Sequence, residues 1–478
     1  MKDPVVVAFD RLVARGCERP LLVTPGRAAL TVGGLDGLSR ALITRLAAAG
    51  LAPGALVGVA CANGVGLLAC VIALRRIGAA VLLLEPLGPA ADTRRNAHAL
   101  GASGLIGCED PWAPSPDAFS VEVFPFHPGV PRLAATAAFV KLTSGSTGAP
   151  RGVAFSSEAI LADEAALATT MGVGGDDRIV AAIPLSHSYG FASVVLPALV
   201  RGSLLVLPGA SGPLSPLNAA REAGATVFPT VPAYLGALLK MSQPPAWPDS
   251  IRLVVSAGAP LPPETAARFR EAYARRVHSF YGASECGGIC FDREGDAGER
   301  GTVGTPVDGV RVELEPVGGA GEEGVVSVTS AAAGEGYVPA ADSRLGGGSF
   351  RTSDVGCWQH GELKLLRRTD SLINVKGRKV DPLEIESTLA SLCGVEEVVA
   401  LGIPDPETGS HTVRVVIACR PGRLSYQEVL SFCRSRLPDH KIPRSIQLVP
   451  AIPRTARGKI DRGVLSESED AHLDSIRH

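Results

Sequence analysis

The first 110 residues alternate helical with strand-like patterns, and this alternation limits the folds open to the chain. Leucines recur at helical spacing in a segment that Thr31 can cap and Gly50 can end. Apolar runs at Leu56–Ala60 and Ala80–Leu84 fit short buried strands, and a helical segment, Gly66–Arg76, separates them. Strands that alternate with helices favour right-handed βαβ units and a largely parallel sheet. We therefore expect an α/β fold.

The chain changes character twice, and these changes predict its domains. Strand and helix patterns continue to about Ser256, and from about Gly301 short alternating strands lie between glycine-rich turns, which predicts a small β subdomain. Beyond Asp370 a compact pattern of helices and strands predicts a second α/β unit. A chain of 478 residues is also long for one domain. We therefore predict a large N-terminal domain over residues 1–369 and a small C-terminal α/β domain over residues 370–478.

A stretch rich in glycine and hydroxyl groups, Lys141–Ser157, lies between apolar segments. Glycine lets backbone N–H groups come close to an anion, hydroxyls add donors, and the guanidinium of Arg151 adds a fixed positive charge. A polar surface loop is the common alternative for such a run. The apolar flanks instead favour a strand–loop–strand cradle for a polyphosphate. Its candidate ligands are Thr143, Ser144, Gly145, Ser146, Thr147, Gly148 and Arg151.

Charge and cysteine usage narrow the functional classes. The net charge is −2, so no basic field favours nucleic acid or an anionic membrane surface. Ten scattered cysteines favour reduced thiols over a disulfide or metal framework. The N-terminus, MKDPVVVAFDR, carries acids where a signal peptide would have an apolar run, and the longest apolar runs are too short to cross a bilayer. We expect a cytoplasmic protein without an integral membrane segment and without a nucleic-acid partner.

Five motifs occur in a fixed order from the glycine-rich loop to the C-terminal region. They are TSGSTGAPRG at 143–152, YGASE at Tyr281–Glu285, RTSD at Arg351–Asp354, RRTDSLINVKGRKVDPLEIE at Arg367–Glu386 and PRTARGKID at Pro453–Asp461. Together they resemble the adenylate-forming (AMP-dependent synthetase/ligase) superfamily of acyl-CoA synthetases, luciferases and peptide synthetase adenylation domains. One motif is weak, whereas five in order are specific, and the resemblance covers nearly the whole chain. The chain looks most like the acid:CoA ligases.

The resemblance implies a two-step ligase. A carboxylic acid attacks the α-phosphorus of ATP to form an acyl adenylate and release pyrophosphate, and the acyl group then passes to the thiol of CoA. Because both reactants of the first step are anions, catalysis depends on positioning and on cations that offset the developing charge. The implied cofactors are ATP, Mg²⁺ and CoA or a phosphopantetheine thiol. The N-terminal domain is expected to bind ATP and the acid, and the C-terminal domain to move about a hinge near Asp370.

The same resemblance assigns roles to single residues. The loop at 143–152 is expected to hold the β- and γ-phosphates, with Arg151 where the family usually has lysine. Glu285 resembles the acid that helps to hold Mg²⁺, and Ser284 stands where threonine is usual. Lys459 resembles the lysine that reaches the α-phosphate and the carboxylate during adenylation. A mobile point charge on a long stem suits that task.

Nucleotide contacts are expected at further positions. Asp354 resembles the acid that accepts both ribose hydroxyls of AMP, and Arg368 resembles the arginine that contacts ribose and phosphate. Ser353 and Arg367, which precede them, replace the usual glycines. The remaining expected nucleotide-binding residues are Gly258, Tyr281 and Gly282.

The acid substrate is expected near PLSHSYGF, residues 184–191. This segment resembles the one in which His187 lies near the carboxylate and walls the pocket, although a lone histidine is as often structural. Amino-acid-activating relatives usually carry an aspartate in the corresponding segment, and Pro184–Ser193 has none. A small plain carboxylic acid is therefore favoured over an α-amino acid.

Three alternatives remain open. The acyl group could pass to the phosphopantetheine of an acyl carrier protein, or to another nucleophile in amide, hydrazine-type or oxidative chemistry. The chain could also be a degraded nucleotide-binding relative, because Arg151, Ser353 and Arg367 depart from the usual pattern. The residues that are retained disfavour this last reading: Glu285, Asp354, Asp370 and Lys459.

Overall fold

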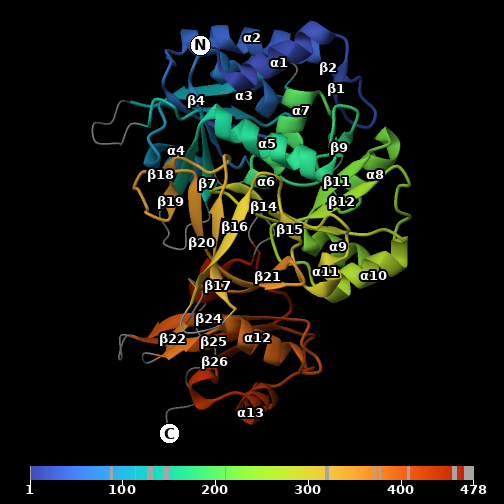
Figure 1. The fold of residues 1–478 in the computed structure, drawn as a ribbon, viewed down its shortest axis with the longest axis vertical. Helices are drawn as coiled ribbons and strands as arrows, with labels where there is room; N and C mark the ends of the chain where they lie inside the picture. Colours follow the sequence, from blue (N-terminus) through green and yellow to red (C-terminus); the bar gives the residue numbers. More distant parts are fainter. Residues whose placement is uncertain are drawn as a thin grey trace. The chain divides into compact units, whose positions relative to one another are not determined.

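The computed structural model describes residues 2–86, 90–113, 115–125, 133–143, 150–209, 212–317, 322–369, 373–375, 378–405, 410–454 and 460–467. The chain forms two compact units, and each is described by itself (Figure 1). The first unit comprises Met1–Thr352 and Cys357–Leu365, and the second comprises Ser353–Gly356 and Leu366–His478. The domain boundary that we place at Asp370 lies outside the described residues and stays a prediction.

A seven-stranded sheet in the first unit carries the end of the glycine-rich loop. Its strand order is β18-β8-β7-β4-β3-β5-β6, and β3, β4, β5 and β7 run parallel. Helices α3 (Val65–Arg76) and α4 (Ala90–Ala99) lie between successive parallel strands in the chain. The strands are β3 (Leu56–Cys61), β4 (Ala80–Leu83), β5 (Gly104–Cys108), β6 (Ser120–Val123), β7 (Phe139–Thr143), β8 (Arg151–Phe155) and β18 (Gly336–Val338). The α/β fold predicted from the alternation is confirmed.

A second, nine-stranded sheet continues the parallel pattern. Its order is β15-β14-β13-β12-β11-β9-β10-β1-β2, with an antiparallel hairpin of β13 and β14 towards one edge. Its strands are β1 (Pro20–Val23), β2 (Leu30–Thr31), β9 (Arg178–Val180), β10 (Leu204–Val206), β11 (Val227–Thr230), β12 (Leu253–Ser256), β13 (His278–Ala283), β14 (Gly287–Phe291) and β15 (Thr305–Pro306). The helices along this part of the chain are α8 (Ser215–Ala223), α9 (Pro232–Leu239), α10 (Pro263–Tyr273) and α11 (Ala297–Arg300).

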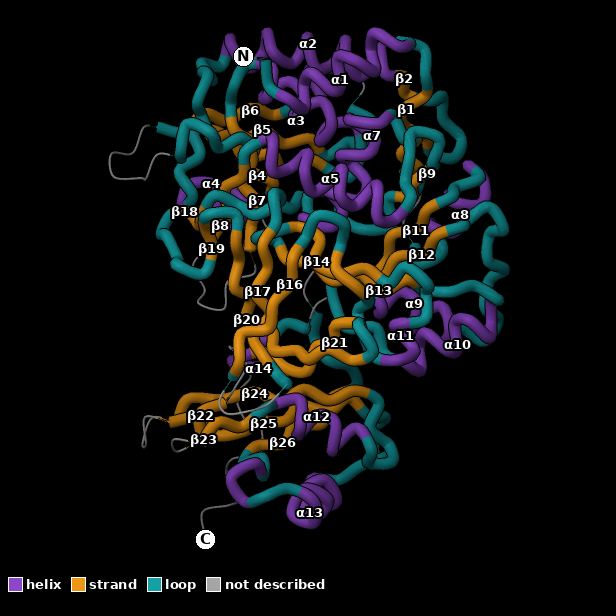
Figure 2. Tube along the Cα trace, viewed as in Figure 1, coloured by secondary structure: helices purple, strands orange, loops and turns teal. Residues whose placement is uncertain are grey.

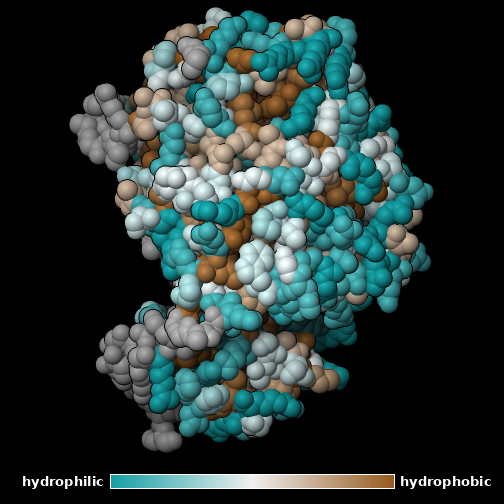
Figure 3. Space-filling view, in the orientation of Figure 1, coloured by the Kyte–Doolittle hydropathy of each residue, from teal (hydrophilic) through white to brown (hydrophobic). Residues whose placement is uncertain are grey.

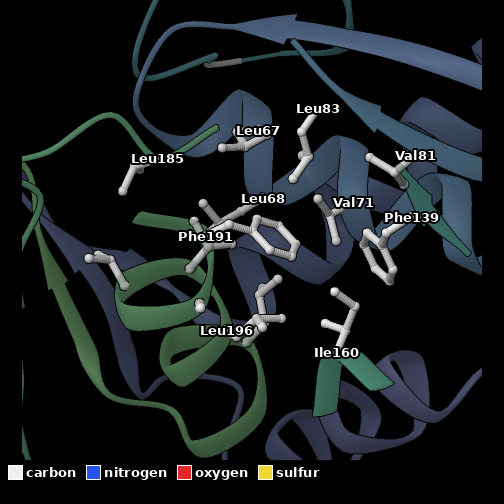
Figure 4. Close-up of a cluster of buried hydrophobic side chains, with 14 of the residues drawn as sticks. Leu67, Leu68, Val71, Val81, Leu83, Phe139, Ile160, Leu185, Phe191 and Leu196 are labelled. Atoms are coloured by element: carbon white, nitrogen blue, oxygen red, sulfur yellow. The ribbon is translucent and has the colours of Figure 1, made fainter. Parts of the chain in front are cut away.

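A buried helical layer anchors the seven-stranded sheet. Helix α3 is apolar on all sides, and every residue from Val65 to Leu74 is buried, as expected for a helix without a polar face. The layer also holds α1 (Pro4–Arg15), α2 (Val32–Ala48), α5 (Ser157–Met171) and α7 (Leu196–Arg201). Figure 2 shows these helices grouped together beside the strands of the sheet. In Figure 4, side chains of α3, β4 and β7 meet Phe191 and Leu196, so the strands that lead to the loop rest on a packed core.

A short helical segment with an irregular turn links the two sheets. Helix α6 (Ser188–Gly190) begins directly after His187, and Phe191–Val195 form a π-helical turn that runs into α7. In this turn the N–H of Leu196 donates to the carbonyl of Phe191, five residues back. Single π turns are rare and are frequent at functional sites.

The remaining strands follow the sequence-based expectations. A five-stranded sheet has the order β16-β17-β20-β19, and β21 pairs with β20. Its strands are β16 (Arg311–Pro316), β17 (Gly324–Thr329), β19 (Leu345–Gly346), β20 (Ser349–Gln359) and β21 (Glu362–Arg368). The second unit contains β22 (Ile373–Val375), β23 (Arg378–Val380), α12 (Pro382–Ala390), β24 (Glu397–Asp405), β25 (Ser410–Ala418), α13 (Tyr426–Arg436), β26 (Ser445–Val449) and α14 (Arg462–Glu467).

The surface and the helices were compared with what a membrane requires. On the face shown in Figure 3, hydrophilic side chains cover the region of α8 and α10, and hydrophobic areas lie nearer the middle of the first unit. Within the described ranges, no helix is both long enough and apolar enough to cross a bilayer.

Candidate active site

The two ends of the glycine-rich loop lie next to each other in a hairpin. Strands β7 and β8 are antiparallel, with Thr143 paired to Arg151, and the Thr143 hydroxyl lies 3.3 Å from the Arg151 carbonyl oxygen, to which it donates. The strand–loop–strand arrangement is therefore as predicted. The inner loop residues of the site prediction, Ser144, Gly145, Ser146, Thr147 and Gly148, lie outside the described residues.

The YGASE segment forms the turn between β13 and β14. Tyr281 and Gly282 lie on β13, and Ser284 and Glu285 lie in the turn. Two contacts from the region of β18 hold Glu285. The Tyr337 hydroxyl donates to Oε1 of Glu285 at 2.9 Å, and the backbone N–H of Gly334 donates to its carbonyl oxygen at 2.8 Å. Both the carboxylate and the backbone of Glu285 are thus fixed.

Tyr337 also connects Glu285 with the end of the loop. The Arg151 guanidinium lies over the Tyr337 ring, 4.2 Å from its centroid, and Arg151 pairs with Asp342 at 3.3 Å. Hydrogen bonds from Arg344 hold the pKa of the Asp342 carboxyl well below its usual range, and Arg151 adds to this effect. Burial, followed by the charge of Glu285, raises the pKa of the Tyr337 phenol, so Tyr337 stays a neutral donor. The planar stacking of Arg151 is a contact that lysine makes less well.

His187 lies between two strand ends of the first unit. Its Nε2 is 2.5 Å from Oε1 of Glu85, the second residue after β4. The hydroxyl of the next residue, Ser188, donates to Oγ of Ser284 at 3.1 Å. The PLSHSYGF segment is therefore tied to β4 on one side and to the YGASE turn on the other.

Glu85 and Tyr337 were not among the residues singled out from the sequence. Both contacts join positions far apart in the chain, 102 residues for Glu85–His187 and 52 for Tyr337–Glu285. Glu85 carried one usable signal, because it is an acid just past the carboxyl end of an expected parallel strand, where α/β proteins bind ligands. Tyr337 carried none.

Two charged residues lie buried beneath these turns. Lys141 on β7 is 2% exposed, and Asp163 on α5 is 3% exposed. Burial lowers the pKa of Lys141 and raises the pKa of Asp163, and the charge of each opposes the shift of the other. Oδ1 of Asp163 accepts the N–H of Gly288 at 3.0 Å, so the carboxylate also holds the start of β14.

Gly287 is the position at which this packing is tightest. Its φ is +72°, in the left-handed region that favours glycine. A Cβ there would lie 2.2 Å from Oδ1 of Asp163, far inside van der Waals contact. The turn that carries Glu285 therefore closes directly onto a buried carboxylate.

The other expected nucleotide-binding positions in the first unit lie at strand ends. Gly258 follows β12, with a φ of +84°, and β12 runs parallel to β13, which carries Tyr281 and Gly282. The ends of neighbouring parallel strands are where α/β sheets bind ligands. In the second unit, Nη1 of Arg368 lies 3.1 Å from Oδ1 of Asp354, so the two residues expected near the ribose form an ion pair. Asp370 and Lys459 lie outside the described residues.

The residues near Glu285 can be tested for their fit to a magnesium ion. In the described part of the chain, no three His, Cys, Asp or Glu side chains gather closely enough to form a metal site of their own. Proteins hold Mg²⁺ mainly through one or two carboxylates together with substrate phosphates and water. A single fixed carboxylate beside the ends of an anion-binding loop fits such a shared site.

Comparison with known proteins identifies the family. The model of the AMP-binding enzyme family matches residues 9–338, and that of the AMP-binding enzyme C-terminal domain matches residues 384–459. Feruloyl-CoA synthase of an Amycolatopsis species is 30% identical over 336 residues, 67% of each chain. Sulfoacetate–CoA ligase of Cupriavidus necator is 28% identical over 497 aligned positions, 96% of this chain and 97% of that protein.

A solved structure extends the likeness over the whole chain. The amide bond synthetase from Marinactinospora thermotolerans superposes with a TM-score of 0.77 at 26% identity, covering 97% of this chain and 99% of that one. The curated relatives named above are CoA-linked enzymes, which agrees with the predicted class, an AMP-forming acid–thiol ligase. By sequence and by fold, the chain belongs to the AMP-binding enzyme family.

Proposed function

We propose that the protein activates a carboxylic acid with ATP, releases pyrophosphate and passes the acyl group from AMP to the thiol of CoA. The observation that carries this proposal is the contact of Tyr337 with both Glu285 and Arg151. It brings a fixed carboxylate and a fixed cation to the two ends of one hairpin loop. That combination suits a site for a metal-bound polyphosphate.

Adenylation needs charge compensation, and this chain offers it from several segments. Mg²⁺ shared between Glu285 and phosphate oxygens would offset the charge that develops on the leaving pyrophosphate. Arg151 and the hydroxyls of the loop would hold the β- and γ-phosphates. Lys459 would bring a further cation to the α-phosphate, and Asp354 with Arg368 would contact the ribose.

The acid would lie near His187, on the side of the sheet where β4 and β7 end. The PLSHSYGF segment lacks the aspartate that pairs an α-ammonium in amino-acid-activating relatives, so a plain carboxylic acid is the proposed substrate class. The acyl group could still pass to an acyl carrier protein, because the same thiol ends both CoA and the carrier arm. Amide formation is the second candidate, favoured by the likeness to an amide bond synthetase.

A pyrophosphate-release screen tests the proposal. Fatty, aryl and amino acids are each supplied with ATP and Mg²⁺, and the acceptor is CoA, an acyl carrier protein with its phosphopantetheine arm, an amine or nothing. We expect release with at least one plain acid, and a thioester product when CoA is present. Release with no acid would refute the proposal and favour a degraded nucleotide-binding protein. An amide product without a thioester would favour the second candidate.

The role of Lys459 has its own test. Lys459→Ala should abolish acid-dependent pyrophosphate exchange while sparing thioester formation from supplied acyl adenylate, because the lysine acts in the first step only. The matched control is Lys240→Ala, which removes an exposed lysine at the end of α9 and should leave exchange unchanged. Normal exchange in Lys459→Ala would show that another cation does this work.

A further inference from the structure

The Glu85–His187 contact is built on rigid supports. Glu85 follows β4, in which every residue is buried, and His187 immediately precedes α6. Leu185 and Phe191, on either side of His187 in the chain, are fully buried in the core (Figure 4). The two side chains themselves stay 22% and 25% exposed, so the pair is accessible to a small molecule. Rigid supports under a partly exposed pair are typical of a preorganised site.

The position of the pair relates it to the phosphate loop. Strand β4 runs parallel to β7, with Leu83 paired to Lys141, so Glu85 and Thr143 lie two residues further on at the same edge of the sheet. This edge is where the loop begins. A group held by Glu85 therefore faces the region in which the acid and the phosphates must meet.

The chemistry of the pair follows from which nitrogen is used. Nε2 of His187 points at a carboxylate, so it carries the proton of this hydrogen bond, and Nδ1 is left as the ring nitrogen that can meet a substrate. The carboxylate also balances the charge of the ring whenever the ring is protonated. An anionic substrate would otherwise meet a bare carboxylate at this edge, and the imidazole placed between them prevents that repulsion.

We propose that Glu85 is a positioning residue for the acid substrate, acting through His187. This inference rests on the proposed function, because it takes the acid to bind beside His187. Glu85 touches neither ATP nor the acid in this account. It fixes the ring and its tautomer, so that one nitrogen is always presented to the incoming carboxylate.

The test compares Glu85→Ala, Glu85→Gln, His187→Ala and the double variant Glu85→Ala/His187→Ala in acid-dependent pyrophosphate exchange. The loss of a hydrogen bond to a charged group predicts a rise of about tenfold or more in the KM for the acid in Glu85→Ala, with little change in the KM for ATP. Glu85→Gln keeps an acceptor for Nε2 and should recover part of this loss. The double variant should be no worse than His187→Ala, because Glu85 acts only through the ring.

The control and the contrary results are equally defined. Glu122→Gln makes the same change on β6 of the same sheet, where Glu122 pairs with the exposed Arg94, and should alter neither KM. The inference is overturned if Glu85→Ala leaves the KM for the acid unchanged, or if the losses of the two single variants add fully in the double variant. An equal rise in both KM values would also overturn it, because that result indicates a general structural role.

A second readout does not depend on activity. In a ¹⁵N-histidine-labelled full-length protein, His187, assigned from the His187→Ala spectrum, should show a protonated Nε2 that loses its low-field proton signal in Glu85→Ala. An Nε2 without a proton in the wild type would overturn the inference. If the wild-type protein adenylates no acid but shows this signal, the proposed function fails while the positioning of the ring by Glu85 stands.

Discussion

The buried charges of Lys141 and Asp163 make a sharp prediction about stability. Lys141→Met keeps a long side chain of similar shape against the Phe155 ring, which lies 4.4 Å from the Lys141 ammonium. It leaves Asp163 as a buried carboxylate without its cation. Removal of one partner from a buried charge pair costs about 3–5 kcal/mol, most of it the penalty of the charge left behind.

This energy can be converted into a melting temperature. The first unit contains about 360 residues. At about 2.1 cal/mol/K per residue, its unfolding entropy is about 0.8 kcal/mol/K, so a loss of 3–5 kcal/mol lowers Tm by about 4–6 °C. Asp163→Asn, which keeps an acceptor for the Gly288 N–H but strands the Lys141 ammonium, should show a fall of similar size.

The assay is thermal unfolding of the full-length protein, followed by circular dichroism, with Lys141→Met/Asp163→Asn as the matched double variant. Neutral partners of similar shape should restore most of the lost stability. The reasoning would be refuted if Lys141→Met melted within a degree of the wild type, or if the double variant lost as much as the two single variants together.

The pH dependence of Lys141→Met gives an independent check. Burial raises the pKa of Asp163 above its unfolded value, so the folded state binds a proton more readily than the unfolded state. The stability from this group is complete below the unfolded pKa and is lost as the pH rises through the folded pKa. The deficit of Lys141→Met should therefore be largest near pH 8 and shrink as the pH falls towards 4.

Three further substitutions probe the site. Gly287→Ala combines a left-handed φ, worth about 1–2 kcal/mol, with a Cβ 2.2 Å from Asp163, so its Tm should fall by at least 1–2 °C; an unchanged Tm in a thermal scan would contradict this packing. Tyr337→Phe frees the Glu285 carboxylate and should raise the KM for Mg–ATP about tenfold in a pyrophosphate-exchange assay with Mg²⁺ titration. Arg151→Ala should raise the KM for ATP by more than Arg151→Lys does, and equal values would deny a role to the charge.

The local patterns in the sequence were enough to predict much of the fold. Buried strands such as β4 and an all-apolar helix such as α3 have their patterns within a few neighbouring residues, so their type could be predicted. The motif segments likewise gave the hairpin ends and the YGASE turn. Asp370, Lys459 and the inner loop residues keep their predicted roles as predictions.

What the sequence could not supply is the pairing of distant segments. Periodicity predicts an element, but it does not say which strand end meets which turn, so the Glu85–His187 contact was out of reach. Lys141 is the clearest example. Beside a hydroxyl-rich run it resembled the first polar residue of a loop, whereas it lies on β7 with its charge buried against α5. Its burial follows from a partner 22 residues away that no local rule connects to it.

The π-helical turn at Phe191–Val195 makes the length of this segment matter more than its side chains. Such a turn holds one residue more than a regular helix would use. Deletion of any one residue within it would let the helix close normally and would rotate everything before the turn by about 100° relative to α7. His187 and Ser188 would then face away from Glu85 and Ser284, although every one of these residues would still be present. The direction in which the histidine faces is thus encoded by a count of residues, which a comparison of residue types alone does not detect.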